Sequence, residues 1–289
     1  MKHNCSIVIP VYNEKDAVVK TVKDIHYLMS KNNISFEIIV VDDGSTDKSV
    51  DEIHNFIENK FDNVKVIYHR RNLGYGAALK SGFKVSKYDQ IVITDADATY
   101  PNEQIPKLLN YIGDYDMVVG ARTGKNVKIP LIRKPAKWVI NQLANYLTNY
   151  KIPDLNSGLR VLKKPLINKF LHYLPDGFSL TSTITLALLT NGYTIKYVSI
   201  DYMTRKGKSK IKPIQDTLNF IQLIIRTVMY FNPLKIFLPF SLVFFGPGIF
   251  FLGRDLINLN IAQTSVLLLI SGALILSIGM LSDLINKRL

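Results

Sequence analysis

The sequence predicts an α/β fold, in which helices flank a mostly parallel sheet, followed by a C-terminal hairpin of two transmembrane helices. Up to about residue 115, short apolar runs alternate with stretches of helical periodicity, which is typical of βαβ units. Polar clusters with acidic residues follow three of the apolar runs. From residue 231 onward the chain is far more apolar than before and contains two long uncharged runs.

The first part of the chain predicts strands separated by helices. The expected strands are runs of aliphatic residues at 6–11, 36–41, 64–68 and 90–94. The expected helices, at 15–30, 45–59 and 76–85, space their apolar residues three or four apart, and Ser45 and Thr46 are candidate N-caps of the second. Further along, strands are expected at 117–120 and 193–200, and helices at 135–150 and 182–190. Such βαβ units imply a parallel sheet with right-handed crossovers. Because parallel strands run in one direction, their carboxyl ends share one edge, where ligands bind.

The C-terminal region predicts two membrane spans. Residues 236–253 and 261–282 contain no charged side chain and would extend roughly 27 and 33 Å as helices, close to the ~30 Å hydrocarbon core of a bilayer. Lys235, Lys287 and Arg288 flank the spans and predict that the catalytic domain and both termini are cytoplasmic. A pair of buried helices in a soluble protein is the alternative.

The expected domains are a catalytic domain at 1–212, an amphipathic segment at 213–232 and the hairpin at 233–289. The amphipathic segment fits a helix in the membrane interface and, equally, an ordinary core helix. No signal peptide is evident, because the first apolar run is short and leads into polar residues.

Composition narrows the classes of partner. The formal net charge of +13 favours anionic partners such as lipid headgroups, phosphorylated small molecules or nucleic acid. A single cysteine excludes a disulfide within the chain and a Cys-rich metal site, and the five histidines show no metal-ligand spacing. No helix-turn-helix, aromatic RNA-binding or zinc-finger signature is present, so nucleic acid is not an expected partner.

The most specific local signal is the sequence Asp95-Ala96-Asp97 at the end of an expected strand. Two carboxylates one residue apart at the carboxyl end of a parallel strand suit a hard divalent cation, which can in turn bind a diphosphate. Asp42 and Asp43 follow the preceding strand at the same edge, where either can accept a hydrogen bond from a base or a ribose.

Six motifs together resemble family 2 glycosyltransferases with the Rossmann-like GT-A fold. In order they are PVYNE (10–14), VDDGSTD (41–47), RNLGYGAAL (71–79), DADATYP (95–101), DLNSGLR (154–160) and RKGKSK (205–210). The last two look like motifs of the branch that contains dolichyl-phosphate mannose synthases and polyprenyl-phosphate glucosyltransferases. The resemblance covers roughly residues 5–215.

The resemblance implies roles for individual residues. The nucleotide-binding residues would be Pro10, Tyr12, Glu14, Asp42, Asp43 and Ala96. The acceptor-phosphate residues would be Arg122, Arg133, Ser157 and Ser209. Asp95 and Asp97 would hold Mg²⁺ or Mn²⁺, and Arg205 and Lys210 would complete the catalytic set. Thr99 and residues 179–183 depart from the pattern of many relatives, which carry Gln and a carboxylate there, so the sugar is not implied.

The expected function is an inverting transfer of a hexose from a nucleotide sugar, GDP-mannose or UDP-glucose, to a dolichyl or undecaprenyl phosphate. A phosphate monoester is already an anion at neutral pH, so this reaction needs no general base. One alternative is a hydroxyl acceptor on a lipid or polysaccharide, for which Asp154 would be the base. A second alternative is a membrane protein that binds a nucleotide sugar without catalysing a reaction. Assembly of the chain into a homo-oligomer is also left open.

Overall fold

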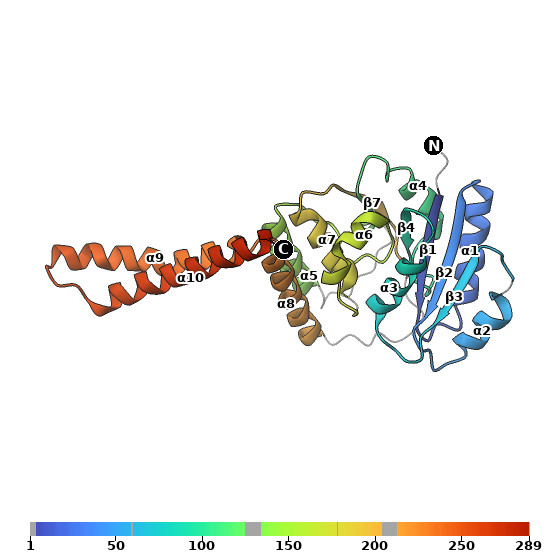
Figure 1. Ribbon diagram of the computed structural model, residues 1–289, viewed down its shortest axis with the longest axis horizontal. Helices are drawn as coiled ribbons and strands as arrows, with labels where there is room; N and C mark the ends of the chain where they lie inside the picture. Colours follow the sequence, from blue (N-terminus) through green and yellow to red (C-terminus); the bar gives the residue numbers. More distant parts are fainter. Residues whose placement is uncertain (1–3, 59, 125–133, 178, 204–212, 289) are drawn as a thin grey trace.

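The computed structural model describes residues 4–58, 60–124, 134–177, 179–203 and 213–288. A helix-covered sheet forms one end of the molecule, and a long two-helix rod projects from the other (Figure 1). Helices α5 and α8 lie between the sheet and the base of the rod, close to where the chain ends. The predicted α/β fold with a C-terminal hairpin is confirmed.

The sheet is mostly parallel. Its strands are β1 (Asn4–Val11), β2 (Ser35–Asp42), β3 (Val64–Tyr68), β4 (Gln90–Ile93), β5 (Met117–Arg122), β6 (Arg160–Lys163) and β7 (Ile195–Ile200). They are arranged in the order β3-β2-β1-β4-β6-β5-β7. Only β6 pairs antiparallel to its neighbours, β4 and β5, among these strands. The amino end of β6 therefore lies at the same edge as the carboxyl ends of the other strands.

Helices cover both faces of the sheet. They are α1 (Val18–Lys31), α2 (Ser49–Phe56), α3 (Tyr75–Val85), α4 (Ile105–Leu109), α5 (Lys134–Thr148), α6 (Lys164–Phe170), α7 (Leu180–Thr190), α8 (Pro213–Phe231), α9 (Leu234–Ile257) and α10 (Gln263–Arg288). Short 3-10 turns at Asn102–Gln104 and Leu171–Tyr173 precede α4 and follow α6. One face of the sheet buries its aliphatic side chains against α1, α2 and α4, and the other against α3, α6 and α7. Fully buried Val and Ile on both faces explain why the strand sequences are continuous apolar runs.

The predicted N-cap of α2 is wrong, and three short elements were not predicted. Ser45 and Thr46 do not cap α2, because the helix begins only at Ser49 and its N-cap residue is Lys48. Both hydroxyl side chains instead bond the loop that follows β1, as described below. Strand β6 and the short helices α4 and α6 were not predicted, because each is too short to show a period of its own.

Helix α8 joins the catalytic domain to the hairpin. Ile224 and Val228 on one face are buried in a cluster with residues of α5 and α7. Elsewhere on α8, Leu218 and Tyr230 are exposed, at 61% and 46%. One face of α8 is thus a core face, while apolar side chains outside this face stay accessible. The division of the chain at residues 212 and 232 stays a prediction.

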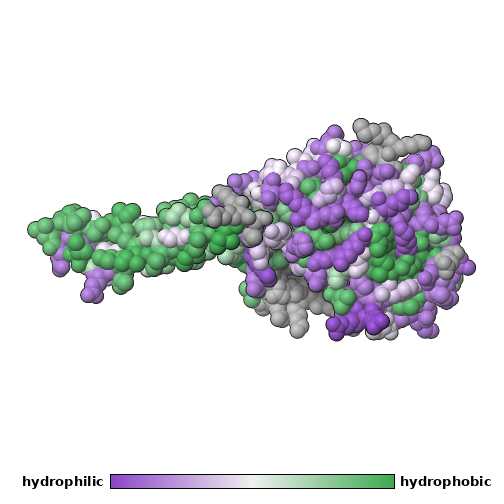
Figure 2. Space-filling view, in the orientation of Figure 1, coloured by the Kyte–Doolittle hydropathy of each residue, from purple (hydrophilic) through white to green (hydrophobic). Residues whose placement is uncertain are grey.

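The hairpin is long, apolar and mostly exposed. Within their spans only 11% of α9 and 17% of α10 are buried, so these are not the core helices of a soluble protein. Figure 2 shows a rod with a largely hydrophobic surface beside a largely hydrophilic body. A Cβ at Gly279 would lie 2.5 Å from Cβ of Phe237, so the absence of a side chain lets the two helices approach closely. The hairpin therefore has the surface and the packing expected of a membrane insertion.

Candidate active site

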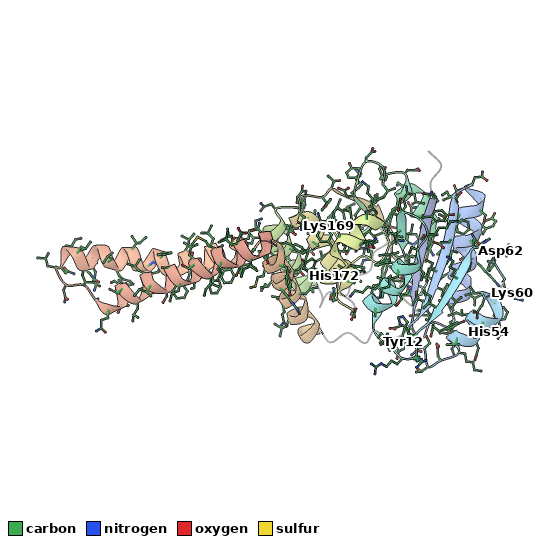
Figure 3. All side chains as sticks on the ribbon, in the orientation of Figure 1. Tyr12, His54, Lys60, Asp62, Lys169 and His172 are labelled. Carbon is green, nitrogen blue, oxygen red and sulfur yellow. The ribbon has the colours of Figure 1, made fainter. Side chains whose placement is uncertain are left out.

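Four chain segments meet at the edge of the sheet where the parallel strands end. They follow β1, β2 and β4, and precede the antiparallel β6. Tyr12, 40% exposed, lies at this edge (Figure 3). The edge brings together most of the predicted site residues that the structure describes.

A cleft of about 520 Å³ opens beside β2. Its walls are formed by Tyr12, Asp42, Gly44, Ser45, Thr46, Val50, Tyr68, His69, Arg70, Arg71 and Asn72. Asp42 is 1% exposed and accepts a hydrogen bond from the Ser45 N–H through Oδ2, at 3.1 Å. Its Oδ1 is buried and accepts no hydrogen bond from the residues that the structure describes. A buried carboxylate oxygen without a donor is unfavourable, so the cleft suits a ligand that brings an N–H or O–H group.

Asp43 lies behind the cleft and is fully engaged. Its Oδ1 accepts from the Leu73 N–H at 2.9 Å and lies 2.7 Å from Nδ1 of His69, and its Oδ2 accepts from the Gly74 N–H at 2.8 Å. The carboxylate is 2% exposed. The sequence could not separate the two neighbouring aspartates. In the structure Asp42 lines the cleft, whereas Asp43 accepts hydrogen bonds from the loop that leads into α3.

Asn13 ties the loops after β1 and β2 together. It has a positive φ of 57°, and its Oδ1 accepts from the Thr46 N–H at 2.8 Å. Its own N–H donates to Oγ of Ser45, and the N–H of Glu14 donates to Oγ of Ser49. No role was predicted for Asn13, although it lies between the predicted site residues Tyr12 and Glu14 in the sequence. Pro10 and Ala96, predicted at the nucleotide, are buried within this framework.

The two carboxylates of the Asp95-Ala96-Asp97 motif are each held by a neighbouring hydroxyl. Oδ1 of Asp95 accepts from the Tyr75 hydroxyl at 3.0 Å, and Oδ1 of Asp97 accepts from the Thr99 hydroxyl at 2.6 Å and from its N–H at 3.1 Å. Among the described residues no group of three or more His, Cys, Asp or Glu forms a metal cluster. Two carboxylates with oxygen ligands fit a divalent cation that takes its remaining ligands from a diphosphate and water.

Arg122 and Asp154 form a bidentate ion pair at the end of β5. Nε and Nη2 of Arg122 donate to the two carboxylate oxygens at 2.7 and 2.9 Å, and the backbone N–H of Arg122 donates as well, at 2.9 Å. Burial alone would lower the pKa of Arg122, but the hydrogen bonds and charge of Asp154 outweigh burial and raise it. The guanidinium also lies 5.2 Å from the ring centre of Tyr202. Arg122 is therefore a fixed cation, with its side chain 22% exposed.

Ser157 does not reach the surface where the resemblance would place it beside an acceptor phosphate. It is fully buried, and its hydroxyl donates to the Gly120 carbonyl at 2.5 Å. Nearby, Arg160 is also fully buried and donates to the carbonyls of Ser157 and Thr181, at 3.0 and 2.7 Å. Burial lowers the pKa of Arg160. These contacts brace the loop between Asp154 and β6, a role that the motif alone did not reveal.

The remaining predicted residues, Arg133, Arg205, Ser209 and Lys210, lie outside the described part of the chain. Their roles stay predictions.

A family model for glycosyl transferase family 2 matches residues 6–171. This range contains both the cleft and the Asp95–Asp97 pair. The chain belongs to glycosyl transferase family 2. A second model, described as the GtrB C-terminal hairpin, matches residues 232–287 and thus the two apolar helices.

Similar curated proteins are bacterial. An undecaprenyl-phosphate 4-deoxy-4-formamido-L-arabinose transferase of Pectobacterium carotovorum is 30% identical over 201 residues, which cover 69% of this chain and 59% of that protein. The same-named protein of an Enterobacter species is 32% identical over 171 residues, covering 59% and 52%. The chain thus spans a little over half the length of these relatives.

Solved structures share the fold. Glucosyl-3-phosphoglycerate synthase from Mycobacterium tuberculosis with UDP aligns with a TM-score of 0.60 at 16% identity, over 78% of this chain and 80% of that one. The complex of that synthase with Mn²⁺, UDP and glucosyl-3-phosphoglycerate gives a TM-score of 0.58 at 18% identity, over 78% and 79%. At this level of identity the likeness establishes the GT-A type of fold for the family 2 domain.

Proposed function

We propose that this family 2 protein transfers a hexose from a nucleotide sugar to a polyprenyl phosphate, with Mg²⁺ or Mn²⁺, and inverts the anomeric centre. The observation that carries the proposal is the arrangement of the Asp95–Asp97 pair and the Asp42 cleft at one edge of a domain that bears a membrane hairpin. The names of the curated relatives, undecaprenyl-phosphate transferases, support the lipid acceptor. The UDP and Mn²⁺ bound by the solved neighbour support the donor class and the metal.

The chemistry of a phosphate acceptor fits the groups at this edge. The acceptor is an anion before it attacks, so the protein must bring two anionic groups together rather than remove a proton. Asp95 and Asp97 would hold the divalent cation, which when bound supplies positive charge to the diphosphate leaving group. Asp154 neutralises the charge of Arg122, but the partly exposed guanidinium keeps N–H groups that would donate to an anionic group at the end of β5. The attack of the lipid phosphate on the face opposite the leaving group would invert the anomeric centre.

The hairpin would keep the site close to the lipid. A polyprenyl tail stays in the bilayer, so an anchored enzyme meets its acceptor at the membrane surface. Trp138 and Tyr146 of α5 are 63% and 57% exposed, and α5 packs on α8 beside the hairpin base. Exposed aromatic side chains of this kind are typical of the level of the headgroups.

Membranes carrying the protein test the proposal directly. They are incubated with a polyprenyl phosphate and a panel of labelled nucleotide sugars, with and without a chelator. We expect one donor to label the lipid in a metal-dependent way. If no donor in the panel labels lipid, or if labelling survives complete removal of divalent metal, the proposal fails.

Asp42→Asn is expected to weaken binding of the nucleoside diphosphate. The substitution replaces one carboxylate oxygen by an amide nitrogen, and a hydrogen bond to a charged acceptor contributes about 1.5–3 kcal/mol, which corresponds to roughly a 10- to 100-fold change in Kd. Calorimetric titration with UDP and with GDP measures the change. Asp62→Asn, an exposed carboxylate beyond α2 (Figure 3), is the matched control and should bind as the unmodified protein does. Equal affinities of all three proteins would exclude Asp42 from the nucleoside site.

The orientation of the hairpin in the membrane can be tested by labelling introduced cysteines, because the native Cys5 is not expected to react with the label. Cys5 is buried, and burial, with a further contribution from Glu37, raises the pKa of its thiol to about 12. Leu259→Cys, at the 94% exposed turn of the hairpin, is expected to react with a membrane-impermeant maleimide added to intact cells. Asp62→Cys, on the catalytic domain, should react only after the membrane is opened. The reverse pattern would place the catalytic domain outside the cytoplasm.

A further inference from the structure

Tyr75 connects helix α3 to the metal-binding motif. It is the first residue of α3, and its hydroxyl donates to Oδ1 of Asp95 at 3.0 Å. A phenol hydroxyl is protonated near neutral pH, so it can donate to the carboxylate.

The backbone on either side of Tyr75 is pinned. Gly74 has a φ of 107°, and a Cβ there would lie 2.5 Å from the Asp176 carbonyl oxygen, so only glycine fits. Its N–H donates to Asp43. On the other side, the N–H groups of Gly76 and Ala77 donate to the carbonyls of Gly177 and Asp176 at 3.2 and 2.9 Å. The start of α3 is thus held from two directions, which fixes the place of the phenol ring.

Gly158 also lies close against the Asp95 carboxylate. A Cβ at Gly158 would lie 2.7 Å from Oδ2 and 2.9 Å from Oδ1 of Asp95, closer than real Cβ atoms come. The N–H of Gly158 donates to the Tyr100 hydroxyl oxygen at 2.7 Å, and Arg160 donates to the carbonyl of the preceding Ser157. The Asp95 carboxylate is therefore contacted both by a fixed backbone and by the Tyr75 hydroxyl.

We infer that Tyr75 is a positioning residue that orients the Asp95 carboxylate for the divalent cation. This inference rests on the proposed function, since that function supplies the cation. Hydrogen-bond partners behind metal-ligating groups set the direction of the ligand atoms, and their removal typically lowers metal affinity by about 10- to 100-fold.

The same segment also borders the nucleoside cleft. Arg71 and Asn72 line the cleft, and Asp43 bonds the N–H groups of Leu73 and Gly74 immediately before Tyr75. Five consecutive residues thus lead from the cleft wall to the carboxylate of the metal motif. A nucleotide that orders the cleft would stabilise the same backbone that holds the phenol.

Tyr75→Phe tests the assignment in the full-length protein in detergent, with Mn²⁺ binding measured by electron paramagnetic resonance in the presence of UDP. We expect the Kd for Mn²⁺ to rise about tenfold or more. The melting temperature and the affinity for UDP without metal should remain as in the unmodified protein. In transfer assays the Mn²⁺ concentration for half-maximal activity should rise while the KM for the lipid phosphate stays constant.

Tyr197→Phe is the matched control. The hydroxyl of Tyr197 is buried and bonds none of the residues that the structure describes, so its removal deletes the same atom without touching Asp95. This variant should bind Mn²⁺ as the unmodified protein does. Equal Mn²⁺ affinity of Tyr75→Phe and Tyr197→Phe overturns the assignment, as does a loss of affinity that appears only with a lowered melting temperature. If the unmodified protein itself binds no Mn²⁺ with UDP and none when GDP replaces UDP, the metal-dependent function fails, and the inference fails with it for that separate reason.

Discussion

Replacing Asp97 by Asn is expected to lower the rate of sugar transfer to lipid by roughly a thousandfold, without loss of the fold. Asn keeps the size of the side chain and keeps an oxygen that can accept from the Thr99 hydroxyl and N–H, so the local hydrogen bonds survive. What disappears is one of two negative charges that would hold the cation. The loss should therefore fall on catalysis rather than on stability.

Two measurements check this expectation on the same preparation. Labelled sugar in the lipid fraction gives the rate, and thermal unfolding in detergent gives the stability. Asp114→Asn, an exposed carboxylate on the loop before β5, controls for a general effect of removing one negative charge. If the Asp97→Asn variant transfers sugar at a rate within a few-fold of that of Asp114→Asn, Asp97 is not a ligand of a catalytic metal ion.

The sheet was predictable where each strand carries its own signal. The apolar runs that became β1, β2 and β4 are buried on both faces over most of their length, so their sequences lack the three-to-four spacing of polar residues that marks a helix. Strand β3 lies at the edge of the sheet and is only partly buried, but its Val and Ile residues still marked it as a strand. Strand β6 has only four residues and begins with a charged one, Arg160. Its place between β4 and β5, running antiparallel, depends on long-range pairing that no local pattern encodes. Yet this strand brings the loop from Asp154 to Gly158 to the site.

The hairpin was predictable because its two helices are recognised by their amino-acid composition and length, not by their contacts with the rest of the chain. Two runs without charge, each about as long as a bilayer core is thick, need no knowledge of the rest of the fold. The turn was less evident. Asp255 accepts from the Ala262 N–H and the Ser265 hydroxyl and so closes the connection between α9 and α10, a bond that only the folded turn displays.

Within the site, the sequence identified the residue types but not their individual tasks. Asp42 and Asp43 are adjacent and chemically identical, and only their directions in the fold separate the cleft residue from the loop residue. Ser157 was predicted at the acceptor phosphate, whereas in the structure it is fully buried and its hydroxyl donates to the Gly120 carbonyl. Tyr75 was read as an ordinary motif residue and Thr99 only as a departure from the motif, because a hydroxyl shows its hydrogen-bond partner only after the chain has folded.

Asp154 separates the proposed reaction from the alternative with a hydroxyl acceptor. A general base must reach the acceptor and exchange protons with it. Asp154 is instead 1% exposed and bidentate with Arg122, whose own N–H it also accepts. Asp154→Asn is therefore expected to lower the free energy of unfolding by about 3–5 kcal/mol, because the buried side of the Arg122 pair loses its counter-charge.

The pH profile decides between the two roles. If Asp154 were the general base, kcat would fall at acid pH as the carboxylate becomes protonated. Asp154→Asn would remove this acid limb and change the melting temperature little. If Asp154 is instead half of an ion pair, Asp154→Asn should lower the melting temperature strongly. The kcat of the protein that remains folded should then depend on pH as it does in the unmodified protein. Arg122→Met with Asp154→Leu serves as the control, since removing both charges should restore part of the stability that the single variant loses. A stable Asp154→Asn protein without the acid limb would make Asp154 the base, and the acceptor would then be a hydroxyl rather than a lipid phosphate.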